Sequence, residues 1–421
     1  MSYDAQNIGF SYFTSPSALI NQHLKTWLAC IQEVGASQVI FKAGFDKAIP
    51  EDAFLIAQEN NLQTIVHFNS ELPLARKFND VAFIMDVYAK WGVKAIILGD
   101  QPNSQTAWPL AGWQYENLID HFLDRFIPLA AHAVRIGLQP VFPPLQPGGD
   151  YWDTAFIELV LKGMKRRKLD SIFEHLMLSS YGYTFDKELF WGKGGPERWS
   201  ISRPYLTPEG QQDQLGFNNY EWIQTQAERA IERKPPILIL DAGNPGMDEV
   251  VNSTSDTLEK IELILLACRG REQADERIID LLNDKDNSIE VCAFDLDTIE
   301  NALDGQLSED IFKQVFCEKN EEENISQNQK NPVVFSHYLL LPAYKSGVSD
   351  VVLNKVRPFI KRFHPTVGFS LSEAAYAKKV SVFPDPLIFT DEQINNLRLA
   401  GCLVDILPES GIDIATSLQS S

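Results

Sequence analysis

Residues 96–103 read Ile-Ile-Leu-Gly-Asp-Gln-Pro-Asn, an apolar run that ends in polar residues. Residues 237–244, Ile-Leu-Ile-Leu-Asp-Ala-Gly-Asn, have the same order. Short strands that are apolar on both faces are typical of a parallel sheet covered on both sides. In a barrel of such strands, the residues that follow each strand lie at the mouth that carries function. Both stretches are therefore interpreted as strands that bring polar side chains to one barrel mouth.

Similar strands recur along the chain and alternate with stretches of helical spacing. The eight strand candidates are Ile8–Thr14, Gln38–Gly44, Gln63–Asn69, Val93–Gly99, Leu138–Phe142, Leu176–Tyr181, Ile237–Asp241 and Ile289–Phe294. Eight strand–helix units in residues 8–317 predict an α/β fold of the (β/α)8 TIM barrel type. A doubly wound open sheet is the second choice, because no G-x-G-x-x-G follows an early strand.

The segments between the strands have the spacing of helices that pack by one face. The clearest example has apolar residues at steps of three and four: Ile119, Phe122, Leu123, Phe126, Ile127, Ala130 and Val134. Gly35, Gly92 and Gly137 stand directly before the next strands, where a left-handed glycine ends a helix. The longest connection, residues 182–219, is rich in Gly, Pro and aromatic residues, and we interpret it as a loop that covers the site.

A second domain is expected after the barrel. Residues 318–331 are polar and charged and read as a linker, because such a stretch cannot bury enough apolar surface to order itself. The strand–helix rhythm then restarts in residues 332–421, with four short strands at Val333–Leu341, Thr366–Phe369, Val380–Phe383 and Leu403–Leu407. Three helices are expected between them, beginning at Val351, Ser372 and Asp391. The sequence therefore predicts a barrel over residues 1–317 and a small C-terminal α/β module of unknown role.

The composition excludes several classes of protein. The 421 residues carry a net charge of −20, which opposes nucleic acid and anionic membranes as partners. The five cysteines are scattered and never in C-x-x-C spacing, which suits a reducing compartment better than a disulfide framework or a zinc site. No signal peptide and no apolar run of roughly 20 residues is visible, so a soluble, cytoplasmic protein is expected.

The two strand ends resemble those of the glycoside hydrolase superfamily that carries carboxylates on strands 4 and 7 of a (β/α)8 barrel. Gly99-Asp100-Gln101-Pro102-Asn103, with Trp108 five residues on, is similar to the G-N-E-P-N stretch of that superfamily. Asp241-Ala242-Gly243 is similar to the strand end that carries its nucleophile. The resemblance covers roughly residues 8–317. It implies a barrel that binds a carbohydrate or glycoconjugate.

The resemblance also shows where this chain departs from the pattern. Gln101 replaces the acid/base glutamate, Asp100 replaces the asparagine before it, and Asp241 replaces the nucleophile glutamate. A glutamine has no transferable proton at neutral pH, and general acid/base help is typically worth about 10²–10⁴-fold. Asp241 keeps the charge on a shorter side chain, and Asp100 is a possible substitute acid beside Gln101. Weak or altered O-glycosyl hydrolase activity is therefore expected.

Other site residues follow from the same comparison. The superfamily often has a tyrosine at the end of strand 6 that touches the nucleophile, a role open to Tyr181 or Tyr183. His67 is expected at the mouth, or as a core histidine bonded to backbone, and Lys42 in an ion pair with a carboxylate. Strand 8 ends with Asp295 and Asp297, where the superfamily commonly has a tryptophan that binds sugar. Further substrate-binding candidates are Asn103, Trp108, Trp152, Trp191 and Trp199.

Other chemistries find no support in the sequence, which has no P-loop, H-E-x-x-H, EF-hand or Gly-x-Ser-x-Gly pattern. We expect no cofactor and no metal. Two alternatives to a weak hydrolase stay open. One is an inactive barrel that binds carbohydrate or acts as a scaffold, with a protein partner bound through the C-terminal module. The other is a barrel enzyme of unrelated chemistry that uses Asp100, His67 and Asp241.

Overall fold

The computed structural model describes residues 7–70, 77–108, 113, 117–185, 187–199, 213–246, 254–269, 281–282, 288–317, 335–342, 350–385, 389–390, 393–394, 397–398 and 402–407. The chain divides into two compact units, Met1–Glu321 and Glu322–Ser421. The stretch interpreted as a linker, residues 318–331, lies outside the described residues, as do residues 200–212 of the long connection after the sixth strand.

The first unit is a barrel of eight parallel strands. Its strands are β1 Ile8–Ser11, β2 Ala36–Ala43, β3 Gln63–Phe68, β4 Ala95–Ile97, β5 Gln139–Val141, β6 Leu178–Tyr181, β7 Ile237–Leu240 and β8 Ile289–Asp295. They pair in the order β5-β4-β3-β2-β1-β8-β7-β6. The two ends of this row meet through a parallel bridge between Val141 and Met177. The barrel expected from the sequence is therefore confirmed, and the open sheet is excluded.

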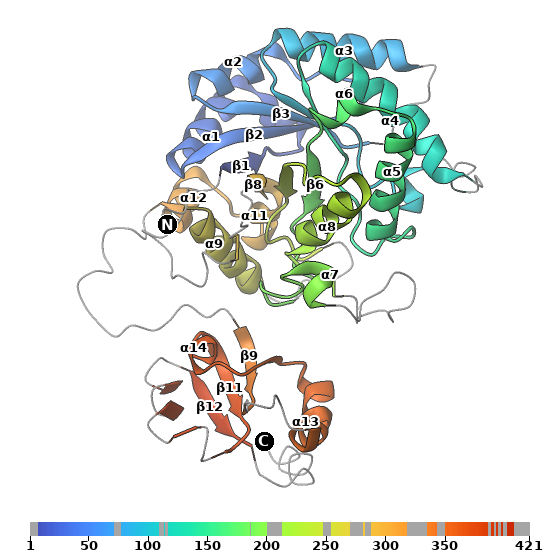
Figure 1. Cartoon of the computed structure of the whole chain (residues 1–421). Helices are drawn as coiled ribbons and strands as arrows, with labels where there is room; N and C mark the ends of the chain where they lie inside the picture. The colour runs from blue at the N-terminus through green and yellow to red at the C-terminus, as the bar shows by residue number, and fades with distance from the viewer. Residues whose placement is uncertain are drawn as a thin grey trace. The chain divides into compact units, whose positions relative to one another are not determined.

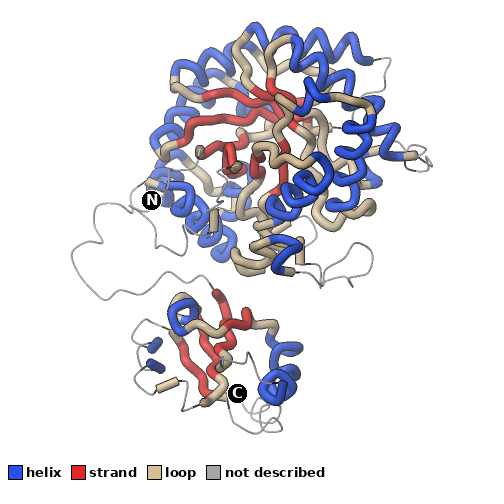
Figure 2. Tube along the Cα trace, viewed as in Figure 1, coloured by secondary structure: helices blue, strands red, loops and turns tan. Residues whose placement is uncertain are grey.

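Helices surround the ring of strands, as the tube in Figure 2 shows. The α-helices of this unit are α1 Asn21–Glu33, α2 Glu51–Glu59, α3 Phe78–Lys90, α4 Leu118–Arg135, α5 Asp153–Arg166, α6 Asp170–Phe173, α7 Gly195–Arg198, α8 Asn219–Ile231, α9 Thr254–Arg269, α11 Leu296–Ala302 and α12 Glu309–Phe316. Short 3-10 turns span Pro16–Leu19 and Gln105–Ala107. Figure 1 shows the helices on the outside and the strands within.

The buried face of α4 differs slightly from the face expected from sequence. Phe122, Phe126 and Ala130 are buried as predicted, but Ile119 and Ile127 are only half buried. The positions that complete the buried stripe are Leu118, Leu129 and Ala133. Helices α1, α3 and α4 are followed by the glycines expected to end them, Gly35, Gly92 and Gly137, with φ of 98°, 83° and 82°.

The inside of the barrel is filled by side chains. Small and branched residues from six of the strands form its core: Ile40, Ile65, Ala95, Ile97, Val141, Leu238, Leu240, Val291 and Ala293, joined by Met177, Tyr181 and Tyr183. A filled barrel has no channel, so a ligand can reach only its ends. The two tyrosines belong to the end at which β6 finishes, which is the functional end expected from the sequence.

The second unit is a small α/β module. Its four parallel strands are β9 Phe335–Leu340, β10 Thr366–Gly368, β11 Ala377–Val382 and β12 Leu403–Ile406, and they pair in the order β10-β9-β11-β12. Helices α13 Asp350–Phe363 and α14 Leu371–Ala374 connect them. Of the helix expected over residues 391–400, the four described residues are helical. The order is that of a doubly wound sheet.

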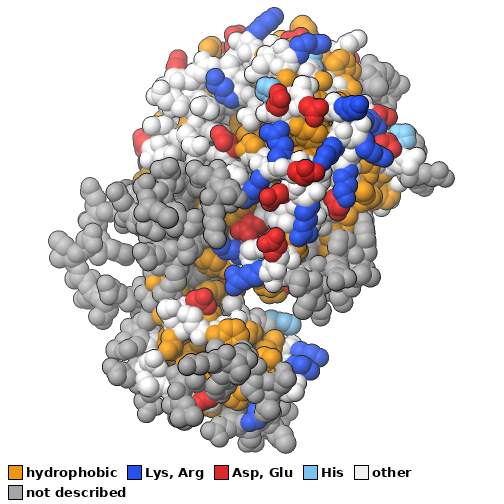
Figure 3. Space-filling view, in the orientation of Figure 1, with side chains coloured by type: hydrophobic (Ala, Val, Ile, Leu, Met, Phe, Trp, Pro, Cys, Tyr) orange, Lys and Arg blue, Asp and Glu red, His pale blue; other side chains and the backbone are white. Residues whose placement is uncertain are grey.

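The surface of the barrel carries ion pairs between acidic and basic side chains. Arg167 contacts Asp120 at 2.9 Å and Asp124 at 2.7 Å, and Lys165 contacts Glu232 at 2.9 Å. Figure 3 shows acidic and basic side chains interspersed on the face in view. Exposed pairs of this kind contribute about 0–1 kcal/mol each, so they bear on solubility more than on the fold.

Candidate functional site

The end of β4 turns sharply at the residues that replace the superfamily's Asn-Glu pair. Gly99 and Gln101 have φ of 102° and 42°, on either side of Asp100. The backbone amide of Gln101 donates to the carbonyl of Pro144 at 2.9 Å, which fixes the turn against the segment after β5. The Gln101 side chain is buried, and its Nε2 has no hydrogen-bond partner among the residues that the structure describes. A buried amide donor without a partner is rare in native proteins and marks a candidate functional position.

The end of β7 repeats this pattern at Asp241. Asp241 has a φ of 48° and is buried, and within the described part of the chain its Oδ1 has no hydrogen-bond partner. Left-handed residues other than glycine typically cost about 1–3 kcal/mol and cluster at functional sites. Burial raises the pKa of Asp241 to about 7, the Lys42 ammonium opposes the rise, and the charges of Asp295 and Asp100 add to it.

A lysine from β2 lies between two carboxylates at the mouth. Lys42 Nζ is 3.0 Å from Asp295 Oδ1 and 3.8 Å from Asp241 Oδ1. Burial would lower the pKa of Lys42, but the charges of Asp241 and Asp295 outweigh it and hold this pKa above its ordinary value. Lys42 is therefore a cation at neutral pH. The expectation of an ion pair at this position is confirmed.

Two stacked tyrosines follow β6 and connect Asp100 to the rest of the mouth. The ring centroids of Tyr181 and Tyr183 are 4.5 Å apart and nearly parallel. The Tyr181 hydroxyl donates to Asp100 Oδ1 at 2.6 Å, which fixes the Asp100 side chain over the barrel from across β5. Burial, and then the charge of Asp100, hold the pKa of Tyr181 well above 10, so its hydroxyl stays a donor.

His67 at the end of β3 is a neutral histidine. Its Nε2 lies 3.2 Å from the Gly99 carbonyl and 3.9 Å from Asp100 Oδ1. A carbonyl only accepts, so Nε2 carries the hydrogen, and the buried Nδ1 has no partner. Burial lowers the pKa of His67 to about 4, against the charge of Asp100. The sequence left open whether His67 faces the mouth or is bonded to backbone, and it does both.

Two candidate substrate-binding residues, Asn103 and Trp108, make contacts that hold loops together, and a third, Trp152, is buried. The Asn103 side chain donates to the carbonyls of Gln146 and Tyr151 and accepts from the Gln146 amide, at 2.8–3.0 Å. Trp108 is buried, and its Nε1 donates to the Pro102 carbonyl at 2.8 Å. Trp152 is buried at the start of α5.

Two further candidates, Trp191 and Trp199, lie in the long connection after β6. Their ring centroids are 5.1 Å apart, and both residues are half buried. Trp199 Nε1 donates to the Lys193 carbonyl at 2.8 Å, whereas the buried Trp191 Nε1 has no partner. Asn218 donates to the carbonyls of Leu189 and Trp191 at 2.7 and 2.9 Å, which attaches this connection to the start of α8.

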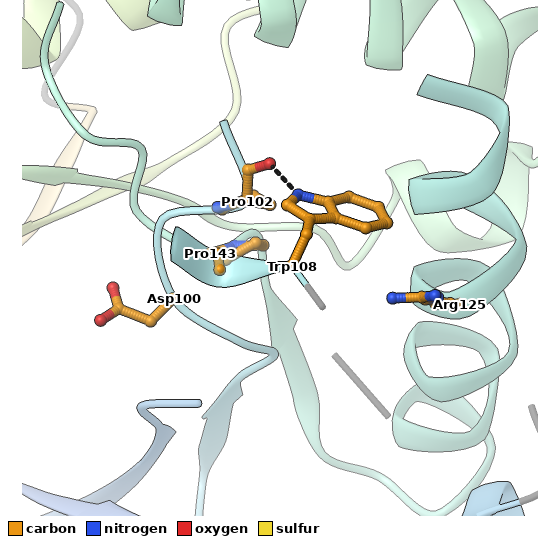
Figure 4. A pocket seen from close by; sticks show the side chains of 6 residues that line it. Asp100, Pro102, Trp108, Arg125 and Pro143 are labelled. Atoms are coloured by element: carbon orange, nitrogen blue, oxygen red, sulfur yellow. Dashed lines mark hydrogen bonds between the residues drawn. The ribbon is translucent and has the colours of Figure 1, made fainter. Parts of the chain in front are cut away.

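A shallow pocket opens beside Asp100. Its lining residues are Asp100, Pro102, Ala107, Trp108, Arg125 and Pro143, and its volume is about 230 Å³ including open space. The Arg125 guanidinium lies 4.7 Å from the centroid of the Trp108 ring. Figure 4 shows the Asp100 carboxylate pointing away from Trp108, so this side chain borders both the pocket and the mouth.

The structure thus brings Asp100, Asp241, Tyr181 and Tyr183 together with His67, and Gln101 directly follows Asp100 at the end of β4. The catalytic and substrate-binding residues predicted from the sequence did not include Lys42 and Asp295, although each is a polar residue near the end of a strand. Their ion pair joins residues 253 apart in sequence, so only the closed barrel reveals it. Polar residues at the ends of β2 and β8 were the available signal.

No three His, Cys, Asp or Glu side chains are grouped to hold a metal ion in the part of the chain that the structure describes. Within the same residues, no helix combines the length and the apolar character needed to cross a membrane.

No family model and no curated protein matches the chain. Among solved structures, a GH5 cellulase from an Icelandic hot spring isolate is 14% identical, with 69% of this chain and 75% of that chain covered and a TM-score of 0.40. A GH128 endo-β-1,3-glucanase from Sorangium cellulosum is 13% identical, with 74% and 97% covered and a TM-score of 0.38. A D-allulose 3-epimerase from Methylomonas sp. is 10% identical, with 75% and 96% covered and a TM-score of 0.39. Likenesses at this level carry no argument about chemistry.

Proposed function

We propose that the barrel binds a carbohydrate or glycoconjugate at the mouth formed by the ends of β4, β6 and β7. We propose further that it has weak or altered O-glycosyl hydrolase activity. The strand-end resemblance to glycoside hydrolases suggests the substrate class. The geometry of the mouth supports a ligand rich in hydroxyl groups.

One observation carries this proposal: Gln101 and Asp241, which occupy matching strand ends, share three uncommon properties. Both have a left-handed backbone, both are buried, and each has a polar atom without a partner. The free atom of Gln101 is a donor and that of Asp241 is an acceptor when ionised. A sugar hydroxyl can both donate and accept, so it can satisfy either atom.

The expected activity is weak because of the residue at the end of β4. Gln101 cannot transfer a proton, so acid/base help must come from the neighbouring aspartates. Asp100 and Asp241 are close enough that the charges of both act on Tyr181 and Tyr183. We therefore assign the hydrolytic chemistry to these two carboxyl groups together.

The alternative is a barrel that binds carbohydrate without cleaving it. The unpartnered Nε2 of Gln101 favours this alternative, because an amide is suited to hold a hydroxyl but not to protonate a leaving group. A test has to measure binding and cleavage separately.

The experiment compares the wild type with the double variant Asp100→Asn/Asp241→Asn on 2,4-dinitrophenyl glycosides of common hexoses and pentoses, in both anomeric forms. We expect slow phenol release by the wild type and none by the double variant. Asp124→Asn, which changes an exposed aspartate paired with Arg167, is the matched control and should behave as the wild type. Saturable oligosaccharide binding without phenol release would favour the binding alternative. Neither binding nor release would contradict the proposal.

A further inference from the structure

Three carboxyl groups lie at the mouth, those of Asp100, Asp241 and Asp295, and they differ in the hydrogen bonds that they receive. Asp241 and Asp295 both lie within 4 Å of Lys42 Nζ. Asp295 is the best supplied. It accepts from Lys42 Nζ at 3.0 Å, and from the amide and hydroxyl of Thr298 at 3.2 and 3.0 Å. Donors to both oxygens favour the ionised form of a carboxyl group. Of the two carboxyl groups beside Lys42, Asp295 is therefore the nearer one and the one that is hydrogen-bonded to it.

Asp100 receives fewer hydrogen bonds but is more exposed to solvent. Its Oδ1 accepts from the Tyr181 hydroxyl at 2.6 Å, and a quarter of its side chain is exposed to solvent. Its position beside the shallow pocket gives water a route to it. A hydrogen bond from a neutral donor and access to water both stabilise a carboxylate.

Asp241 lacks such support at one of its two carboxylate oxygens. Its side chain is 10% exposed, and its Oδ1 receives no hydrogen bond from the described residues. Lys42 is 3.8 Å away, beyond hydrogen-bond distance, and is already bonded to Asp295. A negative charge on a buried carboxylate oxygen without a donor is unfavourable, whereas the protonated form reduces that penalty. Burial accordingly raises the pKa of Asp241 to about 7.

We propose that Asp241 is the proton donor of the hydrolase and that Asp100 is the carboxylate that activates water, the reverse of the roles implied by the resemblance to glycoside hydrolases. This assignment rests on the proposed function and deepens it. When two carboxyl groups in one site have environments that separate their protonation states, the protonated one acts as the acid and the ionised one as the base.

The reaction is then a single displacement. Asp241 gives its proton to the glycosidic oxygen while the bond between that oxygen and the anomeric carbon breaks, and the leaving group departs as an alcohol. Asp100 takes a proton from a water molecule, whose oxygen bonds to the anomeric carbon from the opposite face. An inverting mechanism of this kind needs enough separation between the two carboxyl groups to admit the attacking water.

The protonation of Asp241 depends on every charged or titratable group that faces it. These groups are Lys42 on β2, Asp100 after β4, Tyr181 and Tyr183 at the end of β6, Asp295 on β8 and Asp297 on α11. Lys42 is the one cation in this set, and it favours ionisation of Asp241. The carboxylates oppose ionisation, in the same direction as burial.

The first test uses the leaving group, because a good leaving group needs no acid. Asp241→Asn should lose about 10²–10⁴-fold in kcat/KM on methyl glycosides and much less on 2,4-dinitrophenyl glycosides. Asp100→Asn should lose activity on both, and Asp124→Asn on neither. The product released first should have the inverted anomeric configuration by NMR. The opposite pattern for the two variants, or a product of retained configuration, would overturn the assignment.

The second test needs no turnover, so it separates this inference from the proposed function. Infrared difference spectra of the wild type near pH 6 should contain the C=O band of a buried protonated carboxyl group. Asp241→Asn should remove that band, and Asp100→Asn should leave it. A band lost in Asp100→Asn, or an Asp241 that is ionised near pH 6, would overturn the inference even if hydrolysis is observed. If no saccharide is bound or cleaved, the proposed function fails and the infrared result still decides the state of Asp241.

Discussion

Burial at the barrel mouth shifts the pKa values of His67 and Asp241 in opposite directions. The pKa of His67 falls from 6.5 in a free side chain to about 4, so its contribution to stability is present above pH 6.5 and is lost as pH falls toward 4. The pKa of Asp241 rises from 3.8 to about 7, so its contribution is present below pH 4 and is lost as pH rises toward 7. Between pH 4 and 6.5 the two contributions to the pH dependence of the free energy of unfolding cancel.

Substituting either His67 or Asp241 alone should reveal the pH dependence of the free energy of unfolding that the two opposing contributions conceal in the wild type. In Asp241→Asn, the free energy of unfolding should rise with pH between about 4 and 6.5, by up to about 1.4 kcal/mol per pH unit relative to the wild type. In His67→Gln it should fall over the range from about 4 to 7. Urea unfolding at closely spaced pH values measures both slopes, with Asp124→Asn as the control. Parallel curves for all four proteins would contradict the cancellation.

Single residues of the site were predictable where they follow a strand. Asp100, Gln101 and Asp241 were found from the apolar runs before them, and the structure brings them to one mouth. The partner of Tyr181 was not predictable, because its hydroxyl reaches Asp100 from a strand that is not adjacent to β4. The absence of a hydrogen-bond partner for Gln101 Nε2 among the described residues is likewise visible only in the folded structure.

Strands β6 and β7 approach so closely at their ends that only glycine fits at position 182. The Gly182 amide donates to the Leu240 carbonyl at 2.7 Å, and the Gly243 amide donates to the Gly182 carbonyl at 3.0 Å. A Cβ at Gly182 would lie 2.9 Å from Ile239 Cγ2 and 3.0 Å from the backbone Cα of Ala242. The backbone atom cannot move without shifting the end of β7.

Gly182→Ala should therefore separate Asp241 from the two tyrosines. We expect a loss of about 1–3 kcal/mol in the free energy of unfolding and a larger loss of saccharide binding than Gly44→Ala causes. Gly44 is the matched control, because a Cβ there meets only the carboxylate of Asp46, a side chain that can move. Urea unfolding and binding titrations measure the two effects. An unchanged free energy of unfolding in Gly182→Ala would contradict this prediction, because the end of β7 could then shift at little energetic cost.

The elements themselves were largely predictable. Each of the eight barrel strands overlaps its predicted segment, because a short run apolar on both faces fits a buried parallel strand. The exact face of α4 was not predictable. Leu118, Leu129 and Ala133 complete its buried stripe because the neighbouring strands and α5 set its rotation.

The whole chain contains two units with separate cores. The core of the second unit includes Leu339, Leu341, Val356, Phe359 and Phe383, and all the members of that core lie in residues 339–407. A domain with its own core can in principle fold alone. We therefore expect residues 1–321, expressed without the remainder, to melt cooperatively and to keep the saccharide binding of the full chain. Circular dichroism and binding titrations provide the check, and a piece without a cooperative transition would contradict it.

The barrel closes between β5 and β6 through one bridge, and the backbone bonds there are few. Phe142 donates to the Met177 carbonyl at 2.8 Å, Met177 donates to the Pro140 carbonyl at 3.1 Å, and the Ser179 hydroxyl donates to the Phe142 carbonyl at 2.6 Å. A closed ring offers no free strand edge to another chain. This seam is the place where breathing of the ring would first expose such an edge. The resistance of the barrel to aggregation therefore depends on these few bonds between β5 and β6. Tyr181 lies on β6, so the same bonds also help to hold Tyr181 in place.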